Sequence, residues 1–290
     1  MKKQSKLIFI RPFTNIHVGS GKSNSGKVDN LVQRDVLTEH PVIHSTSLKG
    51  AFRELLLNYL TPDVIDAIFG KGNEKKNGKE NNPDNPNSPG QCDFFNAHLL
   101  TFPMRSDKVT YLHVTSPQII LNFLDKTEVL DVPKDEKLIA ALKKLGGLTI
   151  GEDAPIVFDM SFVGAKIEYH NTITQLCNVN QLTKDEQKLI IDFLGSPLAV
   201  FNDEKLTGFL KKKLPVIARN YLDNGQSKNL WYEEIVPRET LFYTIVTSPA
   251  DMDTFYDAFD GIKQMQIGGN SSVGYGYCKI NIQKQGLWKA

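Results

Sequence analysis

Residues 240–247 read Thr-Leu-Phe-Tyr-Thr-Ile-Val-Thr, a nearly unbroken run of β-branched and aromatic side chains. Such a run predicts a buried strand. The following segment, residues 251–263, carries Met, Phe, Tyr, Phe and Ile at the spacing of one helical face. Residues 274–283 then alternate apolar with polar side chains, which indicates a half-buried strand. We therefore expect a strand–helix–strand unit in this part of the chain.

The opposite end of the sequence pairs a strand with a helix in a similar way. Residues 6–13 predict a strand, and residues 15–30 predict a loop rich in Gly, Ser and Asn. Apolar side chains in residues 45–60 recur at helical spacing, so we expect an amphipathic helix capped by one of the hydroxyl side chains at positions 45–47. Two such units on one antiparallel sheet give an α+β fold with a ferredoxin-like or RRM-like palm.

The middle of the chain is expected to form insertions on this palm. The predicted strands are His98–Met104, Val109–Ser116 and Asp159–Tyr169, and the predicted helices are Asp135–Leu145 and Thr183–Leu194. Residues 71–91 contain no aliphatic or aromatic side chain, so we expect a mobile surface insertion there. Residues 211–227 are polar, basic and aperiodic, which favours a projecting hairpin.

The composition is that of a globular protein. The 290 residues include 40% hydrophobic and 23% charged side chains, which excludes a fibrous or wholly disordered chain. No run of 18 apolar residues occurs, so we expect no membrane partner, and three widely spaced cysteines favour the cytoplasm over a disulfide-bonded secreted fold. The net charge is +1, but residues 1–60 hold nine basic and four acidic side chains. This end of the chain is either a solvated basic face or a surface for nucleic acid.

Two glycine-rich segments invite a phosphate-binding interpretation. The first, Gly19-Ser-Gly-Lys-Ser23, misses the P-loop consensus by one position in either register, so no ATPase is expected. The second, Gly268-Gly-Asn-Ser-Ser-Val-Gly-Tyr-Gly276, has four glycines in nine residues. It is either a simple connection between elements or a loop whose backbone N–H groups approach an anion.

Three further positions have both a bland and a chemical interpretation. Lys49 and Arg53 are four residues apart near the start of the predicted helix, so they form either a solvated face or a clamp on an RNA backbone. Asp29, beside basic residues in a polar loop, is either a turn residue, a metal ligand, or the acceptor of a ribose 2′-hydroxyl proton. His17 is a base, a stacking partner or a filler at the end of a strand.

Taken together, these motifs resemble the RAMP superfamily of CRISPR systems, and more narrowly the guide-RNA-lining backbone subunits of type III-B (Cmr) effector complexes. The resemblance is carried by His17-Val-Gly-Ser-Gly21, Val28-Asp-Asn-Leu-Val-Gln-Arg34, Pro41-Val-Ile43, Ser45-Thr-Ser-Leu-Lys-Gly-Ala-Phe-Arg-Glu54, Ala97-His-Leu-Leu-Thr-Phe-Pro-Met-Arg-Ser106, Leu230-Trp-Tyr-Glu-Glu234 with Pro237, Thr240-Leu-Phe-Tyr243 and the Gly268–Gly276 loop. Residues 28–30 also resemble the corresponding type III-A (Csm) subunit, so both subtypes stay open.

The resemblance implies a single RAMP domain over residues 1–290. Its palm would be built from residues 1–70 and 238–290, with insertions at 92–210 and a β-hairpin thumb at 211–237. It also implies head-to-tail copies along a CRISPR guide RNA, other type III effector subunits as partners, and cleavage of the paired target RNA at regular intervals.

The same resemblance assigns roles to individual residues. Asp29 matches the cleavage residue and would act with Mg²⁺ or Mn²⁺, and His17 and Glu234 match positions near it. The implied RNA contacts are Gln33, Arg34, Ser47, Lys49, Arg53, Arg219, Gly268, Gly269, Gly274 and Gly276. Two alternatives remain: a structural guide-binding subunit without chemistry, and a metal-independent guide-processing nuclease with His17 as general base.

Overall fold

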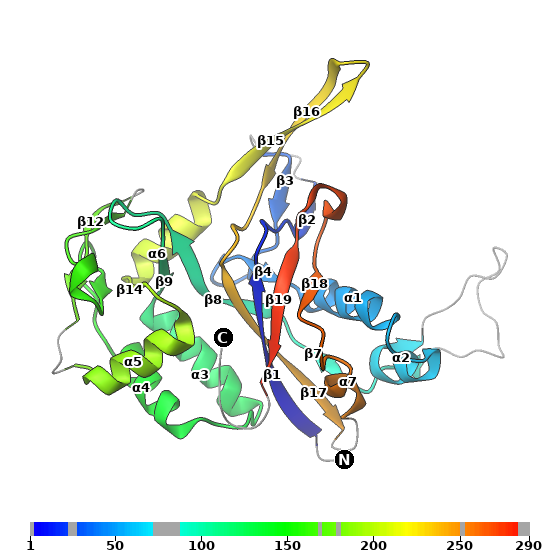
Figure 1. Ribbon diagram of the computed structural model, residues 1–290, viewed down its shortest axis with the longest axis horizontal. Helices are drawn as coiled ribbons and strands as arrows, with labels where there is room; N and C mark the ends of the chain where they lie inside the picture. Colours follow the sequence, from blue (N-terminus) through cyan, green and yellow to red (C-terminus); the bar gives the residue numbers. More distant parts are fainter. Residues whose placement is uncertain are drawn as a thin grey trace.

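The computed structural model describes residues 3–22, 28–71, 88–167, 170–177, 181–249 and 253–283. One eleven-stranded sheet extends through most of the molecule (Figure 1). Its strands follow the order β13 (Gln175–Leu176), β10 (Ile156–Val157), β14 (Leu198–Val200), β9 (Leu112–Thr115), β8 (Ala97–Met104), β17 (Leu241–Pro249), β1 (Lys3–Pro12), β19 (Tyr277–Ile282) and β18 (Gln264–Gln266). Two short strands add to it, β4 (Val42–Ile43) on β8 and β7 (Asp93–Phe94) on β17.

The four central strands, β8, β17, β1 and β19, pair antiparallel throughout. Helix α1 (Ser45–Leu56) lies in the connection from β1 to β8, and α7 (Thr254–Asp257) lies in the connection from β17 to β19. These two helices and α2 (Pro62–Phe69) lie on the same side of the central strands (Figure 1). Phe52 of α1 packs edge-on against Phe255 and Phe259, so the two connections share one apolar core.

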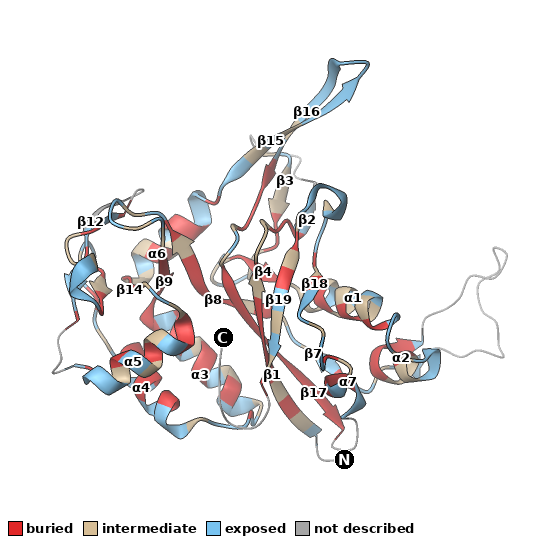
Figure 2. Cartoon of the chain, in the orientation of Figure 1, coloured by how far each residue is buried: buried red, intermediate tan, exposed pale blue. Residues whose placement is uncertain are grey.

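The other side of the central strands is covered by a second group of helices (Figure 1). These are α3 (Pro117–Val129), α4 (Glu136–Gly146), α5 (Lys184–Leu194) and α6 (Asp203–Lys212). Phe9 of β1 contacts Phe123 of α3 and Phe193 of α5. Every residue of β17 is buried, as Figure 2 shows, because the strand has packing partners on both faces.

A separate four-stranded sheet has the order β15 (Val216–Asp223), β16 (Gln226–Glu234), β3 (Asn30–Val32) and β2 (Gly19–Lys22). Strands β15 and β16 form a hairpin that projects from the body and is exposed along most of its length (Figure 2). Asn224 and Gly225 both have positive φ at its tip, which matches the twist of a two-residue turn. This sheet connects the hairpin to the loop that carries Asp29.

The remaining short elements are β5 (Gly70–Lys71) with β6 (Ser88–Pro89), β11 (Lys166–Ile167) with β12 (His170–Ile173), and the 3₁₀ turns η1 (Met160–Phe162) and η2 (Ser271–Val273). No helix in the described ranges is both long and apolar enough to span a bilayer. The α+β class and the strands predicted at 6–13, 98–104, 240–247 and 274–283 are confirmed, as are the helices at 45–60, 135–145 and 183–194 to within a few residues. Most of the predicted insertion at 71–91 lies outside the described residues.

Four local predictions are wrong. The strand predicted over Asp159–Tyr169 is present, among the described residues, only as β11 (Lys166–Ile167), because the Asp159 carboxylate caps a 3₁₀ turn and Gly164 has positive φ. The predicted loop at 15–30 contains β2, which pairs with β3. Helix α1 has His44 as its N-cap, without a side-chain cap, and the N–H of its first residue, Ser45, donates to Asn96 Oδ1 instead. The helix predicted over 251–263 shortens to α7, since the residues after it form turns with i→i−3 hydrogen bonds and Gly261 has positive φ.

Candidate functional site

Strand β16 holds the loop that carries Asp29. The backbone N–H of Asp29 donates to the Tyr232 carbonyl at 3.0 Å, and the Tyr232 N–H donates to Asp29 Oδ2 at 2.8 Å. Asp29 is exposed. One carboxylate oxygen is thus fixed by a strand while the residue stays at the surface, so Asp29 is no simple turn residue in its own loop.

The next residue of β16, Glu233, is buried and binds three other segments. Its Oε1 accepts from Asn30 Nδ2 at 3.2 Å, and its Oε2 accepts from Asn270 Nδ2 at 2.9 Å and from Arg219 at 3.3 Å. Trp231 Nε1 donates to Oε1 at 2.8 Å. Burial raises the pKa of Glu233, but the Trp231 hydrogen bond, the His17 and Arg219 charges and the Asn30 hydrogen bond together outweigh it, so the pKa lies below its ordinary value.

Glu234 faces the opposite side of the strand, as alternation requires. Its Oε2 accepts from the Val32 N–H at 3.1 Å, and its Oε1 forms an ion pair with Arg34 at 2.6 Å. Arg34 also donates to the carbonyls of Glu39 and Leu210, both at 2.8 Å. The predicted catalytic residue Glu234 and the predicted RNA contact Arg34 therefore bind each other in a mostly buried position.

The His17 side chain contacts the backbone of the same strand. Its Nδ1 lies 2.7 Å from the Glu234 carbonyl oxygen, and because a carbonyl only accepts, Nδ1 carries the proton. Nε2 is then the acceptor in the neutral ring, and it lies 3.0 Å from where a Cβ on Gly19 would be. A side chain at position 19 would press on this ring.

The glycine-rich loop packs directly against the His17 segment. The Gly269 N–H donates to the His17 carbonyl at 2.9 Å, and a Cβ on Gly268 would lie 2.4 Å from the same oxygen. A Cβ on Gly276 would lie 2.1 Å from the Ile267 carbonyl oxygen. Gly274 has φ +83° but open space around it. Packing therefore requires glycine at 268 and 276, whereas only the backbone angle favours it at 274.

A groove of about 610 Å³ separates α1 from this loop. Thr46 and Ser47 of α1, Val18, Gly19 and Gly268 are among its lining residues. The two segments predicted to hold phosphate, at opposite ends of the sequence, thus face each other across one groove.

Gln33 fixes the helix to this groove. Its Nε2 donates to Ser47 Oγ at 2.9 Å and to the Gly19 carbonyl at 3.3 Å, and its Oε1 accepts from the His44 N–H at 2.7 Å. The buried amide therefore has protein partners on both its nitrogen and its oxygen, which is the geometry of a residue that positions the groove wall.

Lys49 and Arg53 do not line this groove. They line a second one of about 550 Å³, on the side of α1 that faces α2 and β7. Arg53 donates to the Gly70 carbonyl at 2.8 Å and pairs with Asp66 at 3.3 Å, and Lys49 Nζ lies 5.8 Å from the Phe94 ring centre. Thr46 lines both grooves, and residue-by-residue analysis of the sequence missed it.

Arg219 lies at the base of the hairpin. Its guanidinium is 6.0 Å from the Trp231 ring centre and 5.6 Å from that of Tyr275, which belongs to the glycine-rich loop. Arg219 therefore joins the hairpin to this loop through ring contacts and through Glu233. Glu233 and Asn270 were not among the site residues predicted from the sequence. Strand alternation across positions 233 and 234 was the available signal, because it places the two carboxylates on opposite faces.

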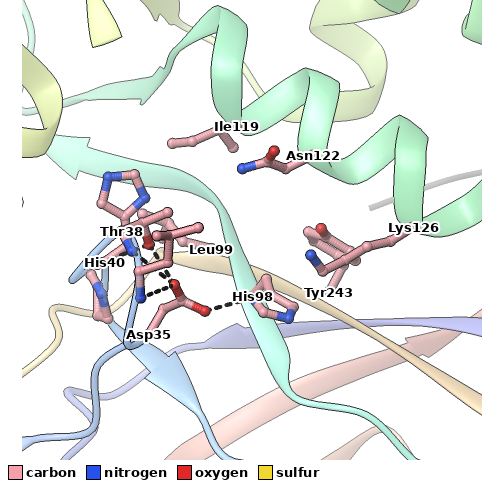
Figure 3. A pocket seen from close by; sticks show the side chains of 11 residues that line it. Asp35, Thr38, His40, His98, Leu99, Ile119, Asn122, Lys126 and Tyr243 are labelled. Atoms are coloured by element: carbon pink, nitrogen blue, oxygen red, sulfur yellow. Dashed lines mark hydrogen bonds and ion pairs between the residues drawn. The ribbon is translucent and has the colours of Figure 1, made fainter. Parts of the chain in front are cut away.

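A further, smaller cavity of about 180 Å³ lies between β8, β17 and α3 (Figure 3). His98, Lys126 and Tyr243 line it, and Asp35 Oδ2 lies 3.9 Å from His98 Nδ1. Burial, aided by the Lys126 charge, lowers the pKa of His98 to about 4. The cavity shares no lining residue with the groove beside Ser47.

The acidic side chains constrain any metal site. Among the described residues, no three His, Cys, Asp or Glu side chains gather closely enough to hold a metal ion. Mg²⁺ keeps several waters and often uses only one or two carboxylates together with substrate phosphates. The exposed Asp29 carboxylate fits such a partial site and does not fit a cage made of protein ligands alone.

The chain is similar to known proteins over most of its length. The family model of the RAMP superfamily matches residues 9–279. The chain is 26% identical to the CRISPR system Cmr endoribonuclease Cmr4 of Pyrococcus furiosus, over 96% of this chain and 95% of that protein. It is 25% identical to the CRISPR system CMR subunit Cmr4 of Saccharolobus solfataricus, over 95% of each.

Solved structures share the fold. A chain of the type III-B Cmr-beta complex bound to cognate target RNA superposes with a TM-score of 0.75 at 22% identity, and the match covers 96% of both chains. Oligomeric Cmr4 from Pyrococcus furiosus superposes with a TM-score of 0.68 at 22% identity, covering 97% of this chain and 98% of that one. The likeness extends over the whole α+β architecture.

Proposed function

Because the chain belongs to the RAMP superfamily, we propose that it is a guide-RNA-binding filament subunit of a type III CRISPR effector that cleaves guide-paired target RNA. The Cmr4 relatives are named as an endoribonuclease and as a CMR subunit, and they match almost end to end. One observation carries the proposal: residues 232–234 of β16 bind the Asp29 loop, the glycine-rich loop and His17 beside one groove.

The groove suits a guide that is bound without regard to its sequence. Backbone N–H groups at the start of α1 favour phosphate, whereas the N–H groups of Gly269, Gly274 and Gly276 donate to protein carbonyls and shape the opposite wall. Phosphate contacts carry no sequence information. Base pairing with the guide then selects the target. Copies of this chain and other type III subunits would line up along the guide in the cytoplasm, as oligomeric Cmr4 suggests for its own chain.

The fold supplies matching parts for this role. The antiparallel order β8-β17-β1-β19, with α1 and α7 in the connections, supports a ferredoxin-like palm. The projecting β15–β16 hairpin serves as the thumb, within residues 211–237, and the helices α3 to α6 belong to insertions at 92–210. A hairpin wedged beside the paired strands would splay one target nucleotide.

Splaying lets a ribose 2′-oxygen align with its own phosphorus for in-line attack. Attack forms the bond from the 2′-oxygen to phosphorus and breaks the bond from phosphorus to the 5′-oxygen, which takes a proton from water. The products are a 2′,3′-cyclic phosphate and a 5′-hydroxyl. Asp29 takes the 2′-hydroxyl proton, and β16 keeps its carboxylate oriented through Tyr232. A Mg²⁺ or Mn²⁺ ion held by Asp29 and RNA phosphate oxygens would stabilise the charge that develops on the phosphate.

The test is Asp29→Asn in the reconstituted complex with guide RNA. We expect target cleavage to disappear while guide and target binding stay within about twofold, because the amide keeps the shape but accepts no proton. The matched control is Asp153→Asn, an exposed carboxylate paired with Lys205 far along the chain, which should cleave normally.

Two other results would replace the proposal. If wild-type complexes bind target but give no product with either cation, the chain is a structural RNA-binding subunit. If the isolated protein cuts guide precursor in EDTA, the chain is a metal-independent processing nuclease, and His17 Nε2 becomes the candidate base.

A further inference from the structure

The Glu233 carboxylate is the point where the parts of the proposed site meet. Its four donors come from both strands of the hairpin, from the Asp29 loop through Asn30, and from the glycine-rich loop through Asn270. The residue is only 6% exposed. An ionised carboxylate can accept at four or more positions, so one side chain satisfies all four donors.

The neighbouring residues show why Glu233 matters for Asp29. Three successive residues of β16 bind the loop through hydrogen bonds. Tyr232 binds Asp29, Glu233 binds Asn30, and Glu234 binds the Val32 N–H. Tyr232 binds only Asp29 in this way, and Glu234 also binds Arg34 and, through its carbonyl, His17. Glu233 is the one of the three whose side chain binds the glycine-rich loop directly, so it ties the loop carrying Asp29 to that wall of the groove.

We propose that Glu233 is a positioning residue that fixes the Asp29 loop relative to the glycine-rich loop and the hairpin. The inference rests on the proposed function, since it concerns the same cleavage site. Charge-assisted hydrogen bonds are the strong ones, and a buried donor that loses its partner costs more than the bond was worth. A neutral amide at this position would turn an N–H group toward some of the four donors, and the loops would separate.

The experiment compares Glu233→Gln with wild type in the reconstituted complex, under single-turnover conditions at saturating target. We expect the cleavage rate to fall at least about tenfold, because displacement by a fraction of an ångström spoils in-line geometry. The dissociation constants for guide and target should stay within about twofold, since Glu233 is buried and touches no groove surface directly. Glu152→Gln, an exposed carboxylate paired with Lys205, is the matched control.

Two milder variants each remove one hydrogen bond to Glu233. Asn30→Ala removes the bond from the Asp29 loop, and Asn270→Gly removes the bond from the glycine-rich loop while suiting the φ of +65° at position 270. Each should slow cleavage less than Glu233→Gln does. The double variant Glu233→Gln/Asn270→Gly should cleave no more slowly than Glu233→Gln alone, because both changes break one contact.

Normal cleavage by Glu233→Gln, or additive effects in the double variant, would overturn the inference. So would a loss explained wholly by weaker assembly, with a normal rate in each assembled complex. If Glu233→Gln does not assemble, the rates of Asn30→Ala and Asn270→Gly decide. An inactive wild type or an active Asp29→Asn variant would instead reject the proposed function, and inactive Asp29→Asn with normal Glu233→Gln rejects only the role of Glu233.

Discussion

Two glycines of one loop, both at positive φ, differ in what surrounds them. Gly268 lies against the His17 carbonyl, whereas Gly274 has open space. Replacing Gly274 by Ala costs only the strain of a left-handed conformation, about 1–2 kcal/mol. Gly268→Ala adds a clash with backbone that cannot move aside, and we expect a loss of at least about 2 kcal/mol beyond the other variant. Urea unfolding of the two variants measures the difference.

The pair also separates stability from RNA binding. Gly274→Ala leaves the groove wall in place, so it should bind guide RNA nearly as well as wild type. Gly268→Ala displaces the wall and should bind more weakly even at temperatures where it is folded. Equal stability of the two variants would show that the loop does not press on the His17 segment.

At the scale of single residues, the sequence indicated some members of the candidate site but not how they contact one another. The glycine-rich loop stands out by its spacing, whereas only the family resemblance assigned a catalytic role to Asp29, because a carboxylate in a polar loop is most often a turn residue. Arg34 was expected to touch RNA, yet its guanidinium binds Glu234 and two carbonyls. Glu234 lies 200 residues away in the chain, so only the pairing of β16 with β3 reveals this partner.

Among the elements, helix α1 shows how one helix can line two grooves. Thr46 is exposed in its first turn and lines both. A carboxylate there suits the positive end of the helix dipole and should change stability by no more than about 1 kcal/mol, in the favourable direction. The same charge repels phosphate. We therefore expect Thr46→Asp to weaken guide binding at least about tenfold at low salt while the melting temperature holds or rises.

The control is Thr46→Ala, which removes the hydroxyl without adding charge and should bind guide within a few-fold of wild type. Filter binding at two salt concentrations, with thermal melts in parallel, makes the comparison. Unchanged guide affinity in Thr46→Asp would place the RNA away from the start of α1.

Helices and strands were predicted correctly where the burial of their residues agrees with the spacing of their apolar side chains. The alternation of 274–283 and the helical spacing of 183–194 both survive, the latter with a capping box of Thr183 and Glu186. Helix α3 went unpredicted although its Ile119, Ile120 and Phe123 are buried. The apolar stripe of residues 251–263 gave too long a helix, because turns can bury aromatic side chains as well as a helix can.

For the whole molecule, buried histidines make stability depend on pH. Burial lowers the pKa of His98 and of His113 to about 4, and burial also lowers the pKa of His40. The unfolded chain, with histidine pKa values near 6.5, binds protons before the folded chain does. The contribution of these neutral histidines to the free energy of unfolding is therefore fully present above pH 6.5. It is lost as pH falls toward 4, by at most about 3 kcal/mol each for His98 and His113.

Urea unfolding at pH 7.5 and at about pH 5 tests this sign. We expect a lower free energy of unfolding at the acidic pH. The double variant His98→Asn/His113→Asn should be less stable at pH 7.5 but should lose less on acidification. A wild-type stability that rises between pH 7.5 and 5 would contradict the prediction.

The class of fold could be predicted from the two ends of the chain, since strand–helix patterns there are strongly periodic. The extent of the main sheet could not. Its outer strands are two to four residues long and pair through contacts between distant segments, which leave no local pattern. The glycine-rich loop and α1 come from opposite ends of the sequence yet face each other across one groove, and no local pattern in either segment reveals this.

The hairpin and the Asp29 loop are parts of one small sheet that does not belong to the eleven-stranded one. The small sheet therefore joins the long exposed β15–β16 hairpin to the short strands β3 and β2, and residues 232–234 lie where the two parts meet. Because the two are parts of one sheet, we expect a displacement of the hairpin tip to shift the Asp29 loop as well. On the proposed function, RNA bound against the hairpin would thereby help to position Asp29, and the shape of that RNA would influence where the strand is cut.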